Sequence, residues 1–97
     1  MASSVHYRFE SYLFPAQVSR IEVEKGSADW RYIRRRHLQL ADERNEQVML
    51  YVYNDDLRRW DYCGIALPGG EWYDFKGDGP YYLDEKGDNF HKKGGSR

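Results

Sequence analysis

Cys63 and the three histidines have side chains that could serve nucleophilic or metal chemistry. A nucleophilic thiol needs a lowered pKa and a base within reach. Cys63 stands inside WDYCGIAL, a run typical of a strand, and the sequence supplies neither requirement, so we interpret it as a structural thiol. His6, His37 and His91 are far apart, with no second Cys and no spacing such as His-x-x-x-His, so no zinc site is predicted.

Carboxylates are the other candidates for chemistry. Asp55, Asp56 and Asp61 could pair for general acid and base work, but such pairs are common in turns and do not by themselves indicate a glycosidase. The acidic stretch 84–88 lacks the register of oxygen ligands in a calcium-binding loop. We therefore expect a non-enzymatic protein with no catalytic residue, no metal and no cofactor; an enzyme that uses Cys63 is the alternative.

The strongest polar signal is the block RYIRRRH. On a helix, Arg31, Arg34 and Arg35 would share one side at spacings of three and four, opposite an apolar stripe. Together with Arg36 they form what we name the Arg ridge. Guanidinium groups bind phosphates and pair with carboxylates, so the ridge is a candidate partner-binding surface. A solvated helix face, balanced by the acidic residues that follow, is the alternative.

The second signal is the segment IALPGGEWYDF. Pro68 followed by two glycines is incompatible with the centre of a strand, so we expect a projecting loop between Leu67 and Trp72. The bond before a proline is the peptide bond that readily becomes cis, which makes this loop a candidate substrate for a proline isomerase. We take Leu67, Pro68, Gly69 and Trp72 as candidate partner-binding residues, with an ordinary β-turn as the alternative.

Composition favours binding over catalysis. Aromatic residues make up 16% of the 97 residues, and nine of them are Tyr. Tyr and Trp bury rigid area while keeping a polar group, so a surplus beyond the needs of a small core is typical of interfaces. The net charge of -1 argues against a histone-like basic protein and against an acidic nucleic-acid mimic.

The expected location is the cytoplasm. The segment MASSVHYRFE has no apolar stretch of a signal peptide, and no run approaches the roughly 18 apolar residues that span a bilayer. A single cysteine cannot form an internal disulfide, which agrees with a reducing compartment. We therefore expect a soluble protein with no membrane partner.

The pattern predicts a single α+β domain over residues 1–90 and a disordered tail over residues 91–97. Apolar spacings of three and four predict a helix over 28–45, whose core stripe contains Trp30, Ile33, His37, Leu40 and Ala41. A hairpin of strands 32–40 and 48–53 is the alternative. Strands are predicted at 5–14, 18–25, 48–53, 58–67, 72–75 and 81–83. The last four would form an antiparallel meander, and the helix would pack on one face of the sheet.

The chain length, the Arg- and Tyr-rich composition, the lack of catalytic motifs and Pro68 in ALPGG together resemble the second anti-RecBCD proteins of lambdoid phages. The resemblance covers the whole chain. It implies a small phage protein in the host cytoplasm that binds the RecBCD recombination nuclease through its RecC subunit and alters the response to Chi sites. It also implies recruitment of a host peptidyl-prolyl isomerase, with Pro68 as the residue that enters the isomerase.

The sequence therefore predicts a non-enzymatic protein-binding module that inhibits or modulates a host DNA-processing machine. An inhibitor of other host machinery, or an immunity protein, is an alternative within the same class. The alternative from a different class is a small nucleic-acid-binding domain, in which the Arg ridge acts with stacking aromatic residues of the sheet. These aromatic candidates are Tyr51, Tyr53, Trp60 and Tyr62.

Overall fold

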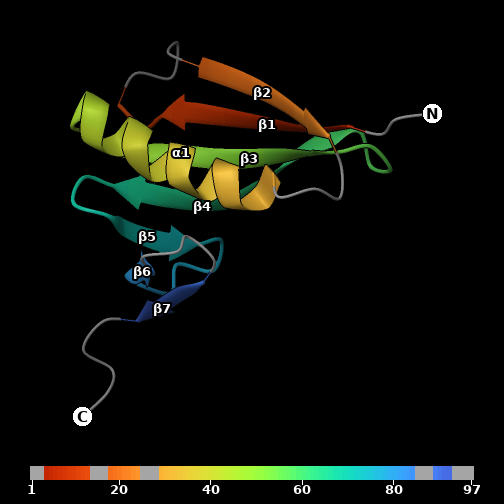
Figure 1. Ribbon diagram of the computed structural model, residues 1–97. Helices are drawn as coiled ribbons and strands as arrows, with labels where there is room; N and C mark the ends of the chain where they lie inside the picture. Colours follow the sequence, from red (N-terminus) through yellow and green to blue (C-terminus); the bar gives the residue numbers. More distant parts are fainter. Residues whose placement is uncertain (1–3, 14–17, 25–28, 85–88, 93–97) are drawn as a thin grey trace.

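The computed structural model describes residues 4–13, 18–24, 29–84 and 89–92. Within them lie β1 (Ser4–Ser11), β2 (Val18–Glu24), α1 (Asp29–Arg44), β3 (Val48–Asn54), β4 (Arg59–Leu67), β5 (Glu71–Asp74), β6 (Tyr81–Leu83) and β7 (Phe90–Lys92). The predicted α+β class is confirmed, because one helix lies against one antiparallel sheet (Figure 1). The predicted helix is also confirmed, and the alternative hairpin over residues 32–40 is excluded.

The strands form one sheet with the order β2-β1-β3-β4-β5-β6-β7. Both β2 and β3 pair antiparallel with β1, so β2 and β3 run in the same direction. The connection between them must cross the sheet, and α1 lies on this crossover, packed over β3 and β4 (Figure 1). From β3 onwards the strands follow one another as the predicted meander.

The end of α1 is set by two hydrogen bonds that close a Schellman motif. Asn45 adopts the left-handed conformation with φ 53°, which Asn tolerates better than most residues. Its N–H donates to Asp42 O at 3.2 Å, and the N–H of Glu46 donates to Ala41 O at 3.2 Å. The chain therefore turns sharply and enters β3 two residues later, which fixes α1 against the start of that strand.

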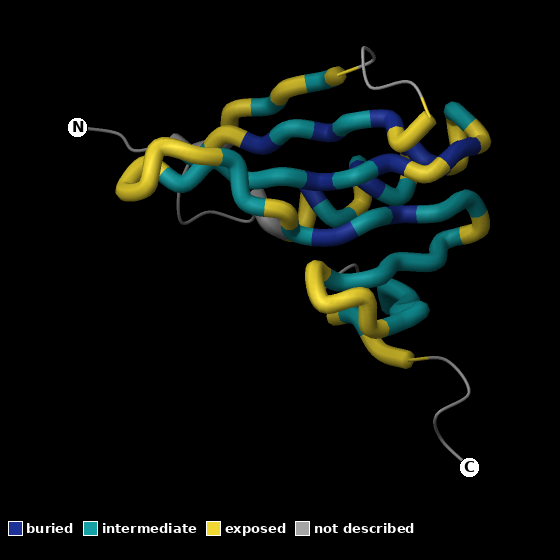
Figure 2. Tube along the Cα trace, turned by 180° about the vertical axis from the view of Figure 1, so that it is seen from behind, coloured by how far each residue is buried: buried dark blue, intermediate teal, exposed yellow. Residues whose placement is uncertain are grey.

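The core lies between α1 and one face of the sheet. Its fully buried apolar side chains alternate along β1 and β3 and recur at helical spacing along α1. They include Phe9, Ile33, Ala41, Val48 and Leu50. Since burying one large aliphatic side chain stabilises by about 1.5–3 kcal/mol, this one layer supplies most of the hydrophobic stabilisation of the fold. The opposite sheet face carries no described element, and Figure 2 views the molecule from that side.

The last strand extends the domain beyond its predicted end. The pairing of β7 with β6 includes Tyr81↔Lys92 and Leu83↔Phe90. The Phe90 ring stacks on Trp72, with centroids 4.7 Å apart and planes 14° from parallel. His91 and Lys92, which the sequence assigned to a tail, are therefore strand residues. The rest of the predicted tail, residues 93–97, lies outside the described residues. The same holds for residues 85–88 and for the side chain of Trp30.

Candidate functional site

The predicted Arg ridge is divided by its surroundings. Arg31 and Arg35 are exposed on α1. Arg34 is half-buried, with its guanidinium carbon 5.6 Å from the centre of the Phe90 ring of β7. Arg36 is also half-buried, and its Nη1 donates to Glu43 Oε2 at 3.4 Å. The four guanidinium groups thus do not form one free basic row, because each of them takes part in an interaction within the protein.

The predicted Leu67–Trp72 loop is a short turn that is tied to α1. The N–H of Gly69 donates to Asp42 Oδ1 at 2.8 Å. Pro68 and Leu67 are half-buried, and only Gly69 of the candidate residues in this turn is exposed. The Leu67–Glu71 pair closes the β4–β5 hairpin directly behind the turn. The loop therefore projects less than the sequence indicates, because a helix carboxylate anchors its tip.

Trp72 points into the contact between helix and sheet. Its indole Nε1–H donates to His37 Nδ1 at 3.2 Å, and its six-membered ring lies against Gly64. An added Cβ at Gly64 would lie 2.5 Å from Trp72 Cζ2, so only a glycine leaves room for this indole. Trp72, a candidate partner-binding residue from the sequence, takes part in the packing of β5 against β4 and α1.

His37 is a buried, fully bonded side chain. The indole N–H can only donate, so Nδ1 accepts and the proton of the neutral imidazole lies on Nε2, which donates to Val48 O at 2.6 Å. Burial is the main cause that lowers the pKa of His37 to about 4, against a smaller opposite effect of the Val48 hydrogen bond. The histidine therefore joins α1, β3 and β5 as a neutral structural group.

The thiol of Cys63 lies at a bulge of the sheet, where the β3–β4 register shifts between Leu50 and Tyr51. Burial, followed by the charge of Asp61, raises the pKa of Cys63 to about 11. A nucleophilic thiol needs a lowered pKa. The environment of Cys63 therefore works against the alternative in which this thiol carries a reaction.

We expect the folded protein to react with a thiol reagent at pH 8 roughly a hundredfold more slowly than the urea-unfolded chain, because the thiolate fraction falls tenfold for each unit of pKa. The measurement is the rate of release of the reagent's coloured leaving group under both conditions. Equal rates in the folded and unfolded protein would return Cys63 to the list of reactive groups.

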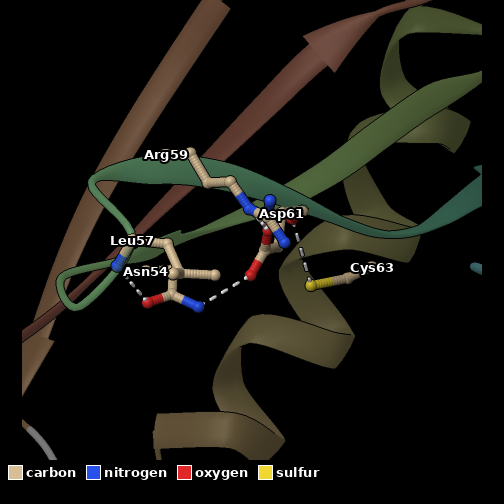
Figure 3. Close-up of polar contacts among 5 residues, drawn as sticks. All are labelled: Asn54, Leu57, Arg59, Asp61 and Cys63. Carbon is tan, nitrogen blue, oxygen red and sulfur yellow. Dashed lines mark hydrogen bonds and ion pairs between the residues drawn. The ribbon is translucent and has the colours of Figure 1, made fainter.

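The carboxylate of Asp61 has a structural role at the end of the β3–β4 hairpin (Figure 3). Asn54 Nδ2 donates to Asp61 Oδ2 at 3.1 Å, and Arg59 Nε donates to Asp61 Oδ1 at 2.8 Å. These two hydrogen bonds, that of Asn54 first, lower the pKa of Asp61. Asn54 Oδ1 also accepts the N–H of Leu57 and so organises the turn. Asp61 is held as an anion by its neighbours rather than poised to exchange a proton.

Among the described residues, no group of three or more His, Cys, Asp or Glu side chains is arranged to hold a metal ion. No helix in the same part of the chain is long and apolar enough to cross a membrane.

A group of aromatic side chains lies on the sheet face opposite α1. Register and alternation place five residues of β1, β3 and β4 together there, and we name them the aromatic face: Arg8, Tyr51, Tyr53, Trp60 and Tyr62. In Figure 2, buried residues alternate with residues of intermediate burial along the central strands, as expected when α1 covers one face of the sheet and the other face is accessible. Tyr62 is 38% exposed, and the other members are half-buried by one another.

The side chains of the aromatic face hold one another in place. The Tyr53 and Trp60 rings meet edge to face at 5.2 Å between centroids, and Tyr51 and Tyr62 are tilted at 5.6 Å. The guanidinium carbon of Arg8 lies 4.6 Å from the Tyr51 ring centre and 4.8 Å from that of Trp60. Cation–π contacts of this kind are worth about 0.5–2 kcal/mol, so Arg8 is ordered before any partner arrives.

Sequence reasoning named the four aromatic members of this face only as stacking groups for the Arg ridge, and it missed Arg8. The structure places the ridge and the aromatic face on opposite sides of the sheet, so they do not form one surface. The β1–β3 register, which pairs Arg8 with Tyr51, brings Arg8 into the cluster. Its sequence signal was the alternation of Arg8 with buried neighbours along a strand.

No protein-family model, curated protein or solved structure matches this chain. The resemblance to the anti-RecBCD proteins therefore stays a prediction from the sequence.

Proposed function

We propose that this protein is a non-enzymatic protein-binding module that contacts its partner through the aromatic face. The observation that carries the proposal is the cluster of Tyr51, Tyr53, Trp60 and Tyr62 around an ordered Arg8 on the sheet side away from α1. Trp, Tyr and Arg are the residue types that dominate the binding energy of protein interfaces. Their mutual contacts lower the entropy that would be lost when a partner orders them.

A protein partner fits this face better than a single-stranded nucleic acid. Base stacking needs an open ring face, but the guanidinium of Arg8 already covers one face of Tyr51 and one of Trp60. The Glu10 carboxylate interacts with Tyr51 and is, after partial burial, a cause of the raised pKa of that phenol. The charges of Glu10 and Arg8 oppose each other at Tyr51, so this face lacks the excess of positive charge that binds a phosphate backbone.

The partner that the sequence resemblance implies is the RecBCD nuclease, bound through its RecC subunit. We include it as the first partner to assay. Recruitment of an isomerase through Pro68 would require the isomerase to break the hydrogen bond between Gly69 and Asp42.

The test measures equilibrium binding to immobilised RecBCD holoenzyme, and to any protein that the wild-type chain captures from a bacterial lysate. We expect Trp60→Ala to weaken the complex by about 2 kcal/mol, or roughly thirtyfold in Kd, as for a central hot-spot residue. The matched control is Arg35→Glu, an exposed change on the far side of the sheet, which should alter Kd by less than about threefold. Circular dichroism checks that both variants are folded.

Three results would contradict different parts of the proposal. Wild-type affinity of the folded Trp60→Ala variant for its protein partner would exclude the aromatic face as the contact surface. Absence of binding to RecBCD, with capture of another protein that depends on Trp60, would remove only the partner implied by the resemblance. Tight binding to an oligonucleotide that weakens steeply with salt would favour the nucleic-acid alternative instead.

A further inference from the structure

A separate pocket lies at the end of the sheet where β1 and β4 finish and where β3 and β5 begin. Its volume is about 520 Å³, and its walls come from three chain segments that are distant in sequence. They are Tyr12 and Leu13 after β1, Asn45 to Gln47 between α1 and β3, and Leu67, Pro68 and Glu71 around the β4–β5 turn. None of these residues belongs to the aromatic face.

One wall of the pocket is apolar and open to solvent. Tyr12 is 56% exposed and Leu13 is 64% exposed, which is unusual for two consecutive large apolar residues at the end of a strand. Tyr12 is nonetheless fixed through its backbone, because its N–H donates to Gln47 O at 3.0 Å. Leu67 and Pro68, at the β4–β5 turn, add further apolar surface to the lining. The wall can cover the aliphatic part of a long side chain.

Two acidic residues also line the pocket. Glu46 is 9% exposed, and the hydroxyl of Ser11 donates to its Oε1 at 2.5 Å, which fixes the carboxylate at the pocket. Glu71, which pairs with Leu67 in the β4–β5 hairpin, supplies a second carboxylate, and no Lys, Arg or His lines the pocket. Asn45 and Glu46 also follow directly on the C-terminal end of α1, where the helix dipole is negative. The lining therefore carries two carboxyl side chains and no cation, and the guanidinium of Arg44 in the last turn of α1 is directed to Ser19 of β2.

We propose that this pocket binds a Lys or Arg side chain of a partner polypeptide in which the basic residue stands next to an apolar one. The carboxylates of Glu46 and Glu71 and the end of α1 attract the cation, while Tyr12 and Leu13 cover the apolar neighbour. Tyr12 adds a ring over which a cation can lie. The site is independent of the aromatic face, so its failure and the failure of the proposed function are distinguishable.

The test uses two blocked dipeptides that differ in charge and match in shape, acetyl-Leu-Arg-amide and acetyl-Leu-citrulline-amide. Each is titrated into the ¹⁵N-labelled full chain, and the amide shifts of Gln47, Gly69 and Glu71 are followed. We expect saturable shifts with the Arg peptide and at least about tenfold weaker binding of the uncharged citrulline peptide, because the charge supplies much of the attraction. Salt at about 0.5 M should weaken the Arg peptide selectively.

Variants then locate the site. Glu71→Gln should weaken the Arg peptide by about fivefold and leave the citrulline peptide unchanged, since it removes one charge without changing the shape. Trp60→Ala should leave both affinities at their wild-type values. Equal binding of the two peptides, or no saturable shift with the Arg peptide up to about 10 mM, would overturn the proposal. Shifts of the same amides that depend on protein concentration without peptide would also overturn it, because the occupant would then be a second copy of the chain.

Discussion

Replacing Gly64 by Ala is expected to lower the free energy of unfolding by about 3 kcal/mol, as measured by urea denaturation. A Cβ at this position would lie 2.5 Å from both Trp72 Cζ2 and the carbonyl oxygen of Tyr73. The carbonyl belongs to the paired β5 strand and cannot move without loss of its sheet contacts. The indole is held by its hydrogen bond to His37 and by its stack on Phe90. Neither neighbour can give way cheaply.

Gly69→Ala is the matched control for this change. Gly64 and Gly69 both have a positive φ, of 156° and 95°, but a Cβ at Gly69 would meet no atom within 4 Å. Its replacement therefore costs only the backbone strain of an L residue in this conformation, on the order of 1–2 kcal/mol. If Gly64→Ala destabilised the protein no more than Gly69→Ala does, the close approach of Trp72 to β4 would be incorrect.

Lowering the pH from 7 to 4 is expected to remove about 3 kcal/mol of stability through His37 alone. The pKa of His37 falls from its ordinary 6.5 to about 4 on folding. Between these values the unfolded chain binds a proton that the folded chain does not, so the stability is complete above pH 6.5 and is lost as the pH falls towards 4. Protonation would also place an N–H on Nδ1, facing the N–H of Trp72.

His37→Gln separates this effect from the titration of other groups. Gln can donate to Val48 O and accept from the Trp72 indole, but it does not titrate. Urea denaturation of both proteins at several pH values should give a steep fall between pH 6.5 and 4 for the wild type and a shallower one for the variant. The carboxylate of Asp61, whose pKa is lowered, acts at lower pH in both proteins. Parallel curves would show that His37 is not a buried neutral group.

The local sequence pattern was sufficient to predict those helices and strands whose apolar residues recur with a regular period. Ile33, His37, Leu40 and Ala41 recur at helical spacing, and all four are buried in the structure. Such a stripe predicts both the helix and its inward face, because an amphipathic helix is stabilised mainly by packing of that stripe.

The orientation of Trp72 and the existence of β7 could not be predicted from the local pattern, because both depend on contacts between segments that are distant in the sequence. Trp72 and Tyr73 are both aromatic, so alternation within a four-residue strand does not indicate which one faces the core. The hydrogen bond from Trp72 to His37, which joins residues 35 positions apart, decides it. Likewise β7 has only three residues, and it exists through its pairing with β6 and the Phe90 stack.

In the candidate site, too, the sequence predicted the residue types but not how the strands bring them together. A surplus of Tyr and Trp indicated binding, but the surface that they form depends on the β1–β3 and β3–β4 registers. Arg8 and Tyr51 are far apart in the chain and become neighbours only when these strands pair. The Arg ridge was correctly placed on a helix, yet the contacts of Arg34 with Phe90 and of Arg36 with Glu43 depend on how that helix sits.

Hydroxyl-radical footprinting of the free protein and of its complex tests the aromatic face most directly, because it reports the accessibility of individual aromatic side chains. Tyr32 on α1 is 52% exposed and Tyr62 on the aromatic face is 38% exposed, so the two tyrosines serve as probes for opposite sides of one sheet. The account predicts that Tyr62 and Trp60 lose reactivity in the complex while Tyr32 keeps it. Protection of Tyr32 with unchanged reactivity of Tyr62 and Trp60 would contradict it.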